Sequence, residues 1–73
     1  MFRKDQKIKK AIKQYQFSTS DTTYIGDESR DVKAAKKAGV KSIAVAWGFE
    51  GRKLLEMARP DKIIDKPSQL QGL

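Results

Sequence analysis

The chain has 73 residues, no cysteine, no histidine and a formal net charge of +7. This length suits one small domain, which buries only about 60% of the surface that its unfolded chain exposes. The missing residue types exclude disulfides, thiolate metal sites and a histidine general base within this sequence. The start of the chain has no apolar signal core, and no apolar run approaches the length of a membrane span, so we expect a cytoplasmic protein.

The first predicted helix is strongly basic and runs from about Asp5, a good N-cap residue, to about Gln16. Residues 1–16 hold six Lys or Arg against one acidic residue, so most of the positive charge lies here. A stripe of this kind can bind nucleic acid or an anionic membrane surface. No stacking aromatics or glycine-rich RNA motif accompany it. A solvated helix face is the simpler interpretation, because the lysines alternate at helical spacing with Ile8, Ala11, Ile12 and Tyr15.

A short strand and a second helix follow. The polar residues 18–21 form a loop, and Thr22–Ile25 is rich in strand-forming residues. The pattern then predicts a helix over about Arg30–Ala38, with Gly39 in the left-handed position that ends it. The apolar face of this helix has small side chains, which would let it lie close to a sheet.

The second half of the chain predicts two further strands separated by a helix. Ser42–Trp47 is apolar without polar alternation, which is typical of a parallel strand buried on both faces. A helix is expected over about Arg52–Ala58, a third strand at Lys62–Ile64 and a last helical turn from Pro67. Because a helix connects each strand to the next, the sheet should be parallel and the domain α/β.

Asp27 and Asp31 are the candidate metal ligands. They belong to the sequence GDESRD at residues 26–31, where the first strand gives way to a helix. Open α/β sheets bind their ligands at the carboxyl ends of the strands, and two carboxylates facing such a crevice suit a hard cation such as Mg²⁺. The simpler alternative is that Asp27 caps the helix and Asp31 stabilises the positive end of its dipole.

Four ordered segments resemble the C-terminal part of haloacid dehalogenase (HAD) superfamily phosphatases, and in particular their phosphoglycolate phosphatase-like branch. The segments are G-D-x-x-x-D at 26–31, V-x-A-A-x-x-A-G at 32–39, I-A-V-A-W-G at 43–48 and P-D-x-I-I-D at 60–65. The resemblance covers nearly the whole chain. It implies a three-layer, Rossmann-like core with a parallel sheet, of which this chain would supply about three strands with flanking helices.

The resemblance also implies Mg²⁺-dependent hydrolysis of a phosphate monoester through an aspartyl-phosphate. Asp27 matches the family's magnesium-binding aspartate and Asp31 the supporting one. Lys4 is a match for the phosphate-binding lysine, which the family places just before the helix that precedes the acidic loop. Arg3 and Lys7 compete for this role, and a solvated lysine is the alternative. Residues 47–49 match a loop that helps to shape the site, although ordinary packing at the end of a strand also explains them.

The chain departs from the family pattern in one large respect. Family members begin with an Asp-x-Asp segment after a hydrophobic strand, which supplies the nucleophile and the acid/base aspartate, and this sequence contains no such segment. We therefore expect residues 1–73 to be the C-terminal part of a phosphatase core, without the catalytic half and the cap, and inactive alone. A natural truncation, an engineered piece and a subunit completed by another chain all fit this expectation.

The leading interpretation is thus a portion of a phosphatase for a small phosphorylated metabolite, with phosphoglycolate as one example. Substrate identity stays open because the cap carries specificity in this family. The alternative is a non-enzymatic module that completes a partner or, through its basic helix, binds nucleic acid. In the parent fold the strand at 22–25 lies beside the nucleophile-bearing strand, so its edge should be unpaired. We therefore expect self-association or binding of a completing chain.

Overall fold

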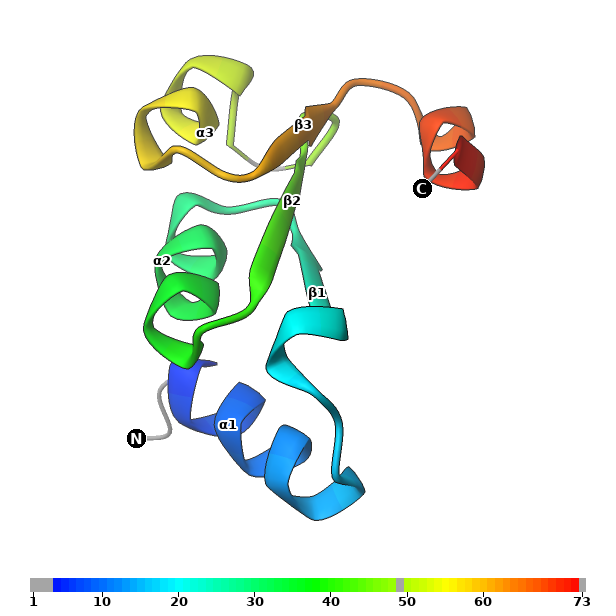
Figure 1. The fold of residues 1–73 in the computed structure, drawn as a ribbon. Coiled ribbons are helices and arrows are strands. Elements are labelled where there is room, and N and C mark those ends of the chain that lie inside the picture. The colour runs from blue at the N-terminus through cyan, green and yellow to red at the C-terminus, as the bar shows by residue number, and fades with distance from the viewer. Residues whose placement is uncertain (1–3, 49, 73) are drawn as a thin grey trace.

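The computed structural model describes residues 4–48 and 50–72, which form a three-stranded sheet with helices gathered on one face (Figure 1). The strands are β1 (Thr23–Gly26), β2 (Lys41–Val45) and β3 (Lys62–Ile64). They lie in the order β1-β2-β3, and both ladders are parallel. The α/β fold with a parallel sheet that the sequence predicts is confirmed.

The helices form a row against this face of the sheet. They are α1 (Lys4–Tyr15), α2 (Ser29–Ala38) and α3 (Arg52–Ala58). α2 is central: it packs on β1 and β2, on α1 at one side and on α3 at the other, while α3 also contacts β3. Two 3₁₀ helices complete the described chain, η1 (Thr19–Asp21) and η2 (Pro67–Gly72).

The core between helices and sheet is built from small side chains on α2. Ala34, Ala35 and Ala38 are buried against Ile8 of α1, which brings the two helices close together. On the other side of α2, the fully buried Leu55 of α3 contacts Val32 and Ala44. The alanine-rich face predicted from the sequence therefore packs against both neighbouring helices and the sheet.

The opposite face of the sheet has much less cover. Ile43, Val45 and Ile64 are buried there, with Leu70 of η2 packed against them. Ile25, at the β1 side of the same face, is 48% exposed. In the described residues, the third layer expected of a Rossmann-like fold is represented only by η2 (Figure 1).

Several element boundaries differ from the prediction. Asp5 lies within the first turn of α1 and is not its N-cap, although a carboxylate stabilises the helix dipole from either position. β1 and β2 run over Thr23–Gly26 and Lys41–Val45, where the sequence predicted 22–25 and 42–47. Residues 46–48 form a turn beyond β2. Gly39 has φ 79° and ends α2 in the left-handed conformation, as predicted.

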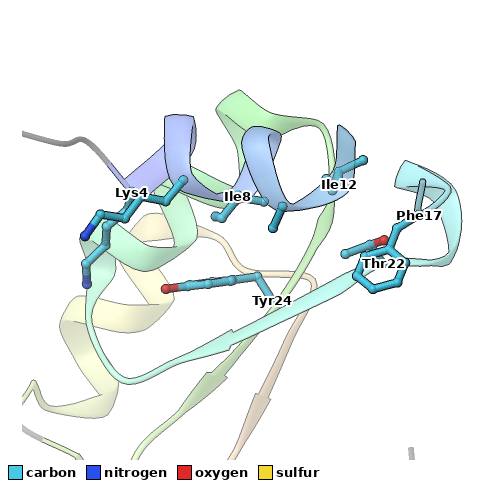
Figure 2. Close-up of a pocket in the computed structure, with 8 residues that line it drawn as sticks. Lys4, Ile8, Ile12, Phe17, Thr22 and Tyr24 are labelled. Atoms are coloured by element: carbon cyan, nitrogen blue, oxygen red, sulfur yellow. The ribbon is translucent and has the colours of Figure 1, made fainter. Parts of the chain in front are cut away.

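A groove separates α1 from β1 (Figure 2). Its volume is about 250 Å³, and it is lined mainly by apolar side chains of α1, together with Phe17, Thr22 and Tyr24 from the chain leading into β1. Figure 2 shows the Tyr24 ring lying flat between the strand and the helix. Among the described residues no helix is long and apolar enough to cross a membrane.

Candidate metal and phosphate site

Three carboxylates gather at the carboxyl end of β1. Asp27 follows the strand directly, Glu28 is the N-cap of α2, and Asp31 lies in the first turn of that helix. One oxygen from each side chain lies within 4.8 Å of the others. The structure thus brings together the two predicted ligands and adds Glu28, which the sequence analysis did not select. Its position inside the acidic GDESRD segment could have identified Glu28 as a member of the cluster.

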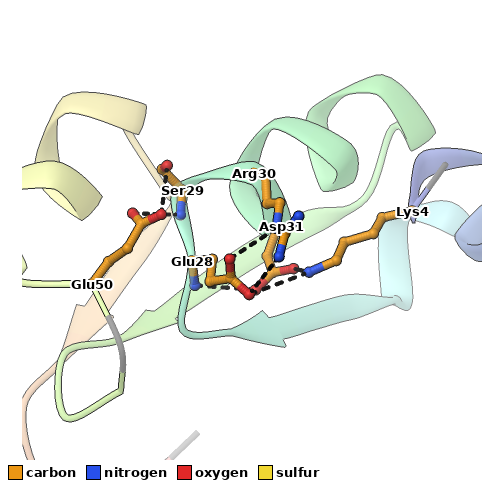
Figure 3. Close-up of polar contacts among 6 residues, drawn as sticks. All are labelled: Lys4, Glu28, Ser29, Arg30, Asp31 and Glu50. Carbon is orange, nitrogen blue, oxygen red and sulfur yellow. Dashed lines mark hydrogen bonds and ion pairs between the residues drawn. The ribbon is translucent and has the colours of Figure 1, made fainter.

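Asp31 is held by two partners and is only 4% exposed (Figure 3). Its Oδ2 accepts a hydrogen bond from the backbone N–H of Glu28 at 3.1 Å, which closes the first turn of α2. Its Oδ1 accepts a hydrogen bond from the ammonium group of Lys4. The expected helix-terminal role of Asp31 is therefore present, and the same carboxylate also contacts the predicted phosphate-binding lysine.

Lys4 links α1 to the acidic loop across 27 positions of the sequence. Its Nζ also lies 3.8 Å from a carboxylate oxygen of Glu28. The hydrogen bond to Asp31 raises the pKa of Lys4 above its ordinary value, partial burial opposes this, and the charges of Asp31 and Glu28 raise it further. The amine therefore stays protonated and offsets part of the negative charge of the cluster. Among its competitors, Lys7 is exposed and lines the α1–β1 groove, and Arg3 lies outside the described residues.

Two glycines allow the carboxylates to sit against the backbone. A Cβ added at Gly26 would lie 2.6 Å from Cγ of Asp31, and one added at Gly48 would lie 2.7 Å from Cγ of Asp27, with still closer contacts to the Cβ atoms of both aspartates. Carbon atoms at such distances overlap, so any larger residue would displace the carboxylates. The turn after β2 therefore forms one wall of the site through Gly48.

Glu50 ties this turn to the start of α2. Its carboxylate accepts hydrogen bonds from the backbone N–H of Ser29 at 2.9 Å and from the Ser29 hydroxyl at 3.2 Å (Figure 3). The N–H groups of a first helical turn have no partner within the helix, so an acidic side chain is favourable there. Nothing in the local sequence pattern points to this contact, because it joins residues 21 positions apart.

Arg30 and Trp47 complete the surroundings of the cluster. The guanidinium of Arg30 donates to both carboxylate oxygens of Glu28, at 2.8 and 3.3 Å, and this contact raises the pKa of Arg30. Trp47 is 44% exposed beside the wall formed by Gly48. Phe49, the last residue of the predicted shaping loop, lies outside the described residues.

The arrangement suits a hard divalent cation. Carboxylate oxygens are the ligands that Mg²⁺ prefers, and it keeps its remaining positions for water and phosphate. Oxygens of Asp27, Glu28 and Asp31 lie close together here; the charge of Asp31 is partly balanced by Lys4, and Glu28 is paired with Arg30. The carboxylate chemistry of this cluster and the spacing of its oxygens are therefore compatible with Mg²⁺.

Comparison with known proteins identifies the family. The family model described as haloacid dehalogenase-like hydrolase matches residues 2–45, more than half of the chain. The chain belongs to this family. The matched residues include α1, the acidic loop and all of β2, so the resemblance to the HAD superfamily that the sequence indicates is confirmed.

Individual HAD-like relatives point to phosphatases. The chain is 49% identical over 47 residues to a phosphoglycolate phosphatase from Synechococcus elongatus, a match that covers 64% of this chain and 22% of the relative. It is 35% identical over 63 residues to the pyrophosphatase PpaX of Bacillus mycoides, covering 86% of this chain and 29% of the relative. The chain therefore spans less than a third of the length of these curated relatives.

The solved structures agree with the fold. A HAD-like family protein from Streptococcus pneumoniae superposes with a TM-score of 0.87 at 28% identity, covering 93% of this chain and 32% of that protein. Over 93% of its length this chain thus has the fold of a HAD-like hydrolase, while most of the neighbour lies outside the match.

Proposed function

We propose that this chain is the C-terminal, metal-binding portion of a Mg²⁺-dependent phosphatase that acts on small phosphate monoesters. The observation that carries the proposal is the carboxylate cluster of Asp27, Glu28 and Asp31 at the carboxyl end of β1, with Lys4 beside it. Relatives named phosphoglycolate phosphatase and pyrophosphatase support phosphate chemistry. Phosphoglycolate is the first substrate to test.

Each residue has a defined task in this proposal. Asp27 would hold the cation, with Asp31 in support, and the cation when bound would offset negative charge on the phosphoryl group during transfer. Asp31 supports the cluster and orients Lys4, whose ammonium group binds a phosphate oxygen. Gly48 lets Asp27 occupy its position, and Glu50 fixes the turn that contains Gly48. The nucleophile and the acid/base group would come from the part of a HAD-like core that this sequence does not contain.

Metal binding is tested by titrating MgCl₂ into the ¹⁵N-labelled chain and following amide chemical shifts. Carboxylates from one loop fill only part of an octahedral shell, so we expect a dissociation constant on the order of millimolar. Shifts should centre on residues 26–31 and disappear in Asp27→Asn. The matched control is Asp65→Asn, which removes an exposed carboxylate paired with Arg52 on another part of the surface. Equal effects of the two substitutions would contradict the site.

The absence of a nucleophile segment is tested separately. The isolated chain, incubated with p-nitrophenyl phosphate and Mg²⁺, should release p-nitrophenol only at the background rate. A rate above background that Asp27→Asn abolishes would mean that the chain is a complete catalyst, and it would refute the assignment as the metal-binding portion alone.

The proposal includes a second polypeptide or a second copy as a partner. It is supported by the position of β1 at an edge of the sheet and by the apolar groove next to it. Binding through this region would also serve a non-enzymatic module, so activity of the assembled complex, and not binding alone, distinguishes the two functions.

A further inference from the structure

Exposed lysines of α1 and α2 lie side by side on the outer surface of the row of helices. The sequence indicates a basic stripe on the first helix, and the structure places a second row, from α2, beside it. Five exposed residues make up this surface, which we call the lysine face: Lys9, Lys10, Lys13, Lys33 and Lys37. The lysine face is separate from the carboxylate cluster and from the α1–β1 groove.

The packing of α1 on α2 brings the two rows together. Four of the lysines are next in sequence to residues packed between the two helices: Lys9 and Lys13 beside Ile8 and Ile12, and Lys33 and Lys37 beside Ala34 and Ala38. Because these four side chains are exposed, they stand along the outer rim of the helix–helix interface. The two lysines of a row are about 6 Å apart along the helix, and packed helices have axes about 8–10 Å apart. The rows therefore form one compact surface, with Lys10 at its α1 side.

The lysine face has no negative charge beside it on either helix. The acidic residues of α1 and α2 are Asp5 and Asp31, and each is only 4% exposed. None of the five lysines forms an ion pair with another residue in the described ranges 4–48 and 50–72. In α3, by contrast, Arg52 pairs with Glu56 one turn later.

This arrangement of charge is unfavourable for the free chain. Lys9 and Lys13, like Lys33 and Lys37, are like charges at positions i and i+4 of a helix, and such pairs are destabilising. Interspersed charges of both signs would keep the surface soluble without this repulsion. A surface of one sign therefore suits a ligand that supplies the missing negative charge.

From this arrangement we infer that the lysine face binds the phosphate backbone of a double-stranded nucleic acid, without sequence-specific contacts to its bases. A duplex carries one negative charge per about 1.7 Å of its axis, so it presents several phosphates to a surface of this size. Contacts from lysine to phosphate position a nucleic acid but carry no sequence information. The inference goes beyond the proposed function, because it concerns a different surface and a macromolecular ligand.

Other anionic partners match the lysine face less closely. Helices that bind a membrane surface also insert apolar side chains, but the apolar side of α1 faces α2 and the groove. Single strands are bound by stacking on aromatic rings, and the stacked pair of Tyr15 and Phe17 lies at the groove, which Phe17 lines. Interfaces between proteins are depleted in lysine. Duplex phosphates are thus the favoured partner.

The test is a titration of the chain into a fluorescently labelled DNA duplex, followed by anisotropy at about 50 and 200 mM KCl. An RNA duplex of the same sequence is titrated in parallel. The face variant replaces four lysines by glutamine, which has a similar helix propensity. Its substitutions are Lys9→Gln, Lys13→Gln, Lys33→Gln and Lys37→Gln.

A matched control variant removes the same amount of charge from other parts of the surface. It replaces four exposed lysines outside α1 and α2: Lys41→Gln, Lys53→Gln, Lys62→Gln and Lys66→Gln. Each variant lowers the net charge from +7 by four, to +3. Thermal unfolding establishes that the variants remain folded. If the face variant does not fold, two double variants, one for each helix, take its place.

Five phosphate contacts predict a salt slope of about −4.5, which corresponds to a roughly 500-fold loss of affinity between about 50 and 200 mM salt. At the lower salt concentration we expect the face variant to bind at least about tenfold more weakly than the wild type, with a much shallower salt dependence. The control variant should stay within about threefold of the wild type. Because the contacts are to phosphates, both duplexes should bind, and the tighter one identifies the source of the phosphates.

Equal losses in the face and control variants would show that net charge alone attracts the duplex, and would overturn the proposal. So would the absence of duplex binding by the wild type, or tighter binding to the single strand. Binding to vesicles of phosphatidylcholine and phosphatidylserine that the face variant abolishes, with duplex binding unchanged, would assign the face to a membrane and refute the chosen partner. None of the five lysines belongs to the proposed metal and phosphate site, so failure of that site would leave these results unchanged.

Discussion

Gly48 provides a sharp test of how the site is built, because its missing side chain makes room for Asp27. In Gly48→Ala the new Cβ would lie 2.7 Å from Cγ of Asp27 and closer still to its Cβ. Rotating the carboxylate cannot relieve a contact with Cβ, so either the turn after β2 or the start of α2 must move. Overpacking of this kind costs about 1–3 kcal/mol, a large share of the roughly 3–5 kcal/mol that a core of this size supplies.

The assay is thermal unfolding followed by circular dichroism, together with the Mg²⁺ titration described above. A loss of 1 kcal/mol lowers the melting temperature of a domain this small by about 4–8 °C. Gly51→Ala is the control for the substitution itself, because a Cβ added there meets no atom within 4 Å, and as the N-cap of α3 it loses only the preference of that position for glycine. We expect Gly48→Ala to melt well below Gly51→Ala and to bind Mg²⁺ more weakly. Equal melting temperatures and equal affinities would refute the close approach of the turn to Asp27.

Two further predictions concern the charged contacts of the site. The pKa of Lys4 is raised by Asp31, so its stabilising contribution is complete below the unfolded pKa of about 10.4 and is lost as the pH rises through the folded value. Denaturation curves should therefore show the wild type losing its advantage over Lys4→Met above about pH 10.4, and a constant difference at higher pH would contradict the ion pair. Glu50→Gln removes the charge at the N-terminus of α2 and should cost about 1 kcal/mol, with amide shift changes at Ser29 and the 46–48 turn. The control Glu56→Gln removes an exposed carboxylate that pairs with Arg52, and similar changes at Ser29 in both variants would argue against the tether.

The fold was predictable from the sequence because its signals are local. The apolar run that forms β2, the glycine that ends α2 and the acidic segment after β1 can each be recognised from a few consecutive residues. The end of β2 was predicted two residues too late, at Trp47. Ala46 still donates to the Ile64 carbonyl at 2.9 Å, but the chain turns there, and apolar character alone does not mark that point.

The contacts that shape the site could not be predicted in this way. Two of these contacts link the loop after β1 to the loop after β2: the hydrogen bonds from Ser29 to Glu50, and the close approach of Gly48 to Asp27. Only the pairing of β1 with β2 brings these two loops together. The groove between α1 and β1 likewise depends on how the helices and strands pack, because Ile8 and Ile12 appear in the sequence as an ordinary apolar helix face.

The sequential strand order has a consequence for folding kinetics. β1 pairs with β2 across 18 residues, from Thr23 to Lys41, and β2 pairs with β3 across 19, from Ile43 to Lys62. The entropy lost on closing such loops grows only with the logarithm of their length, and predominantly local contacts are associated with fast folding. The helix that packs on each pair of strands also lies between those two strands in the sequence. Refolding can therefore start at either strand–helix–strand unit and spread to the other, without first bringing the two ends of the chain together.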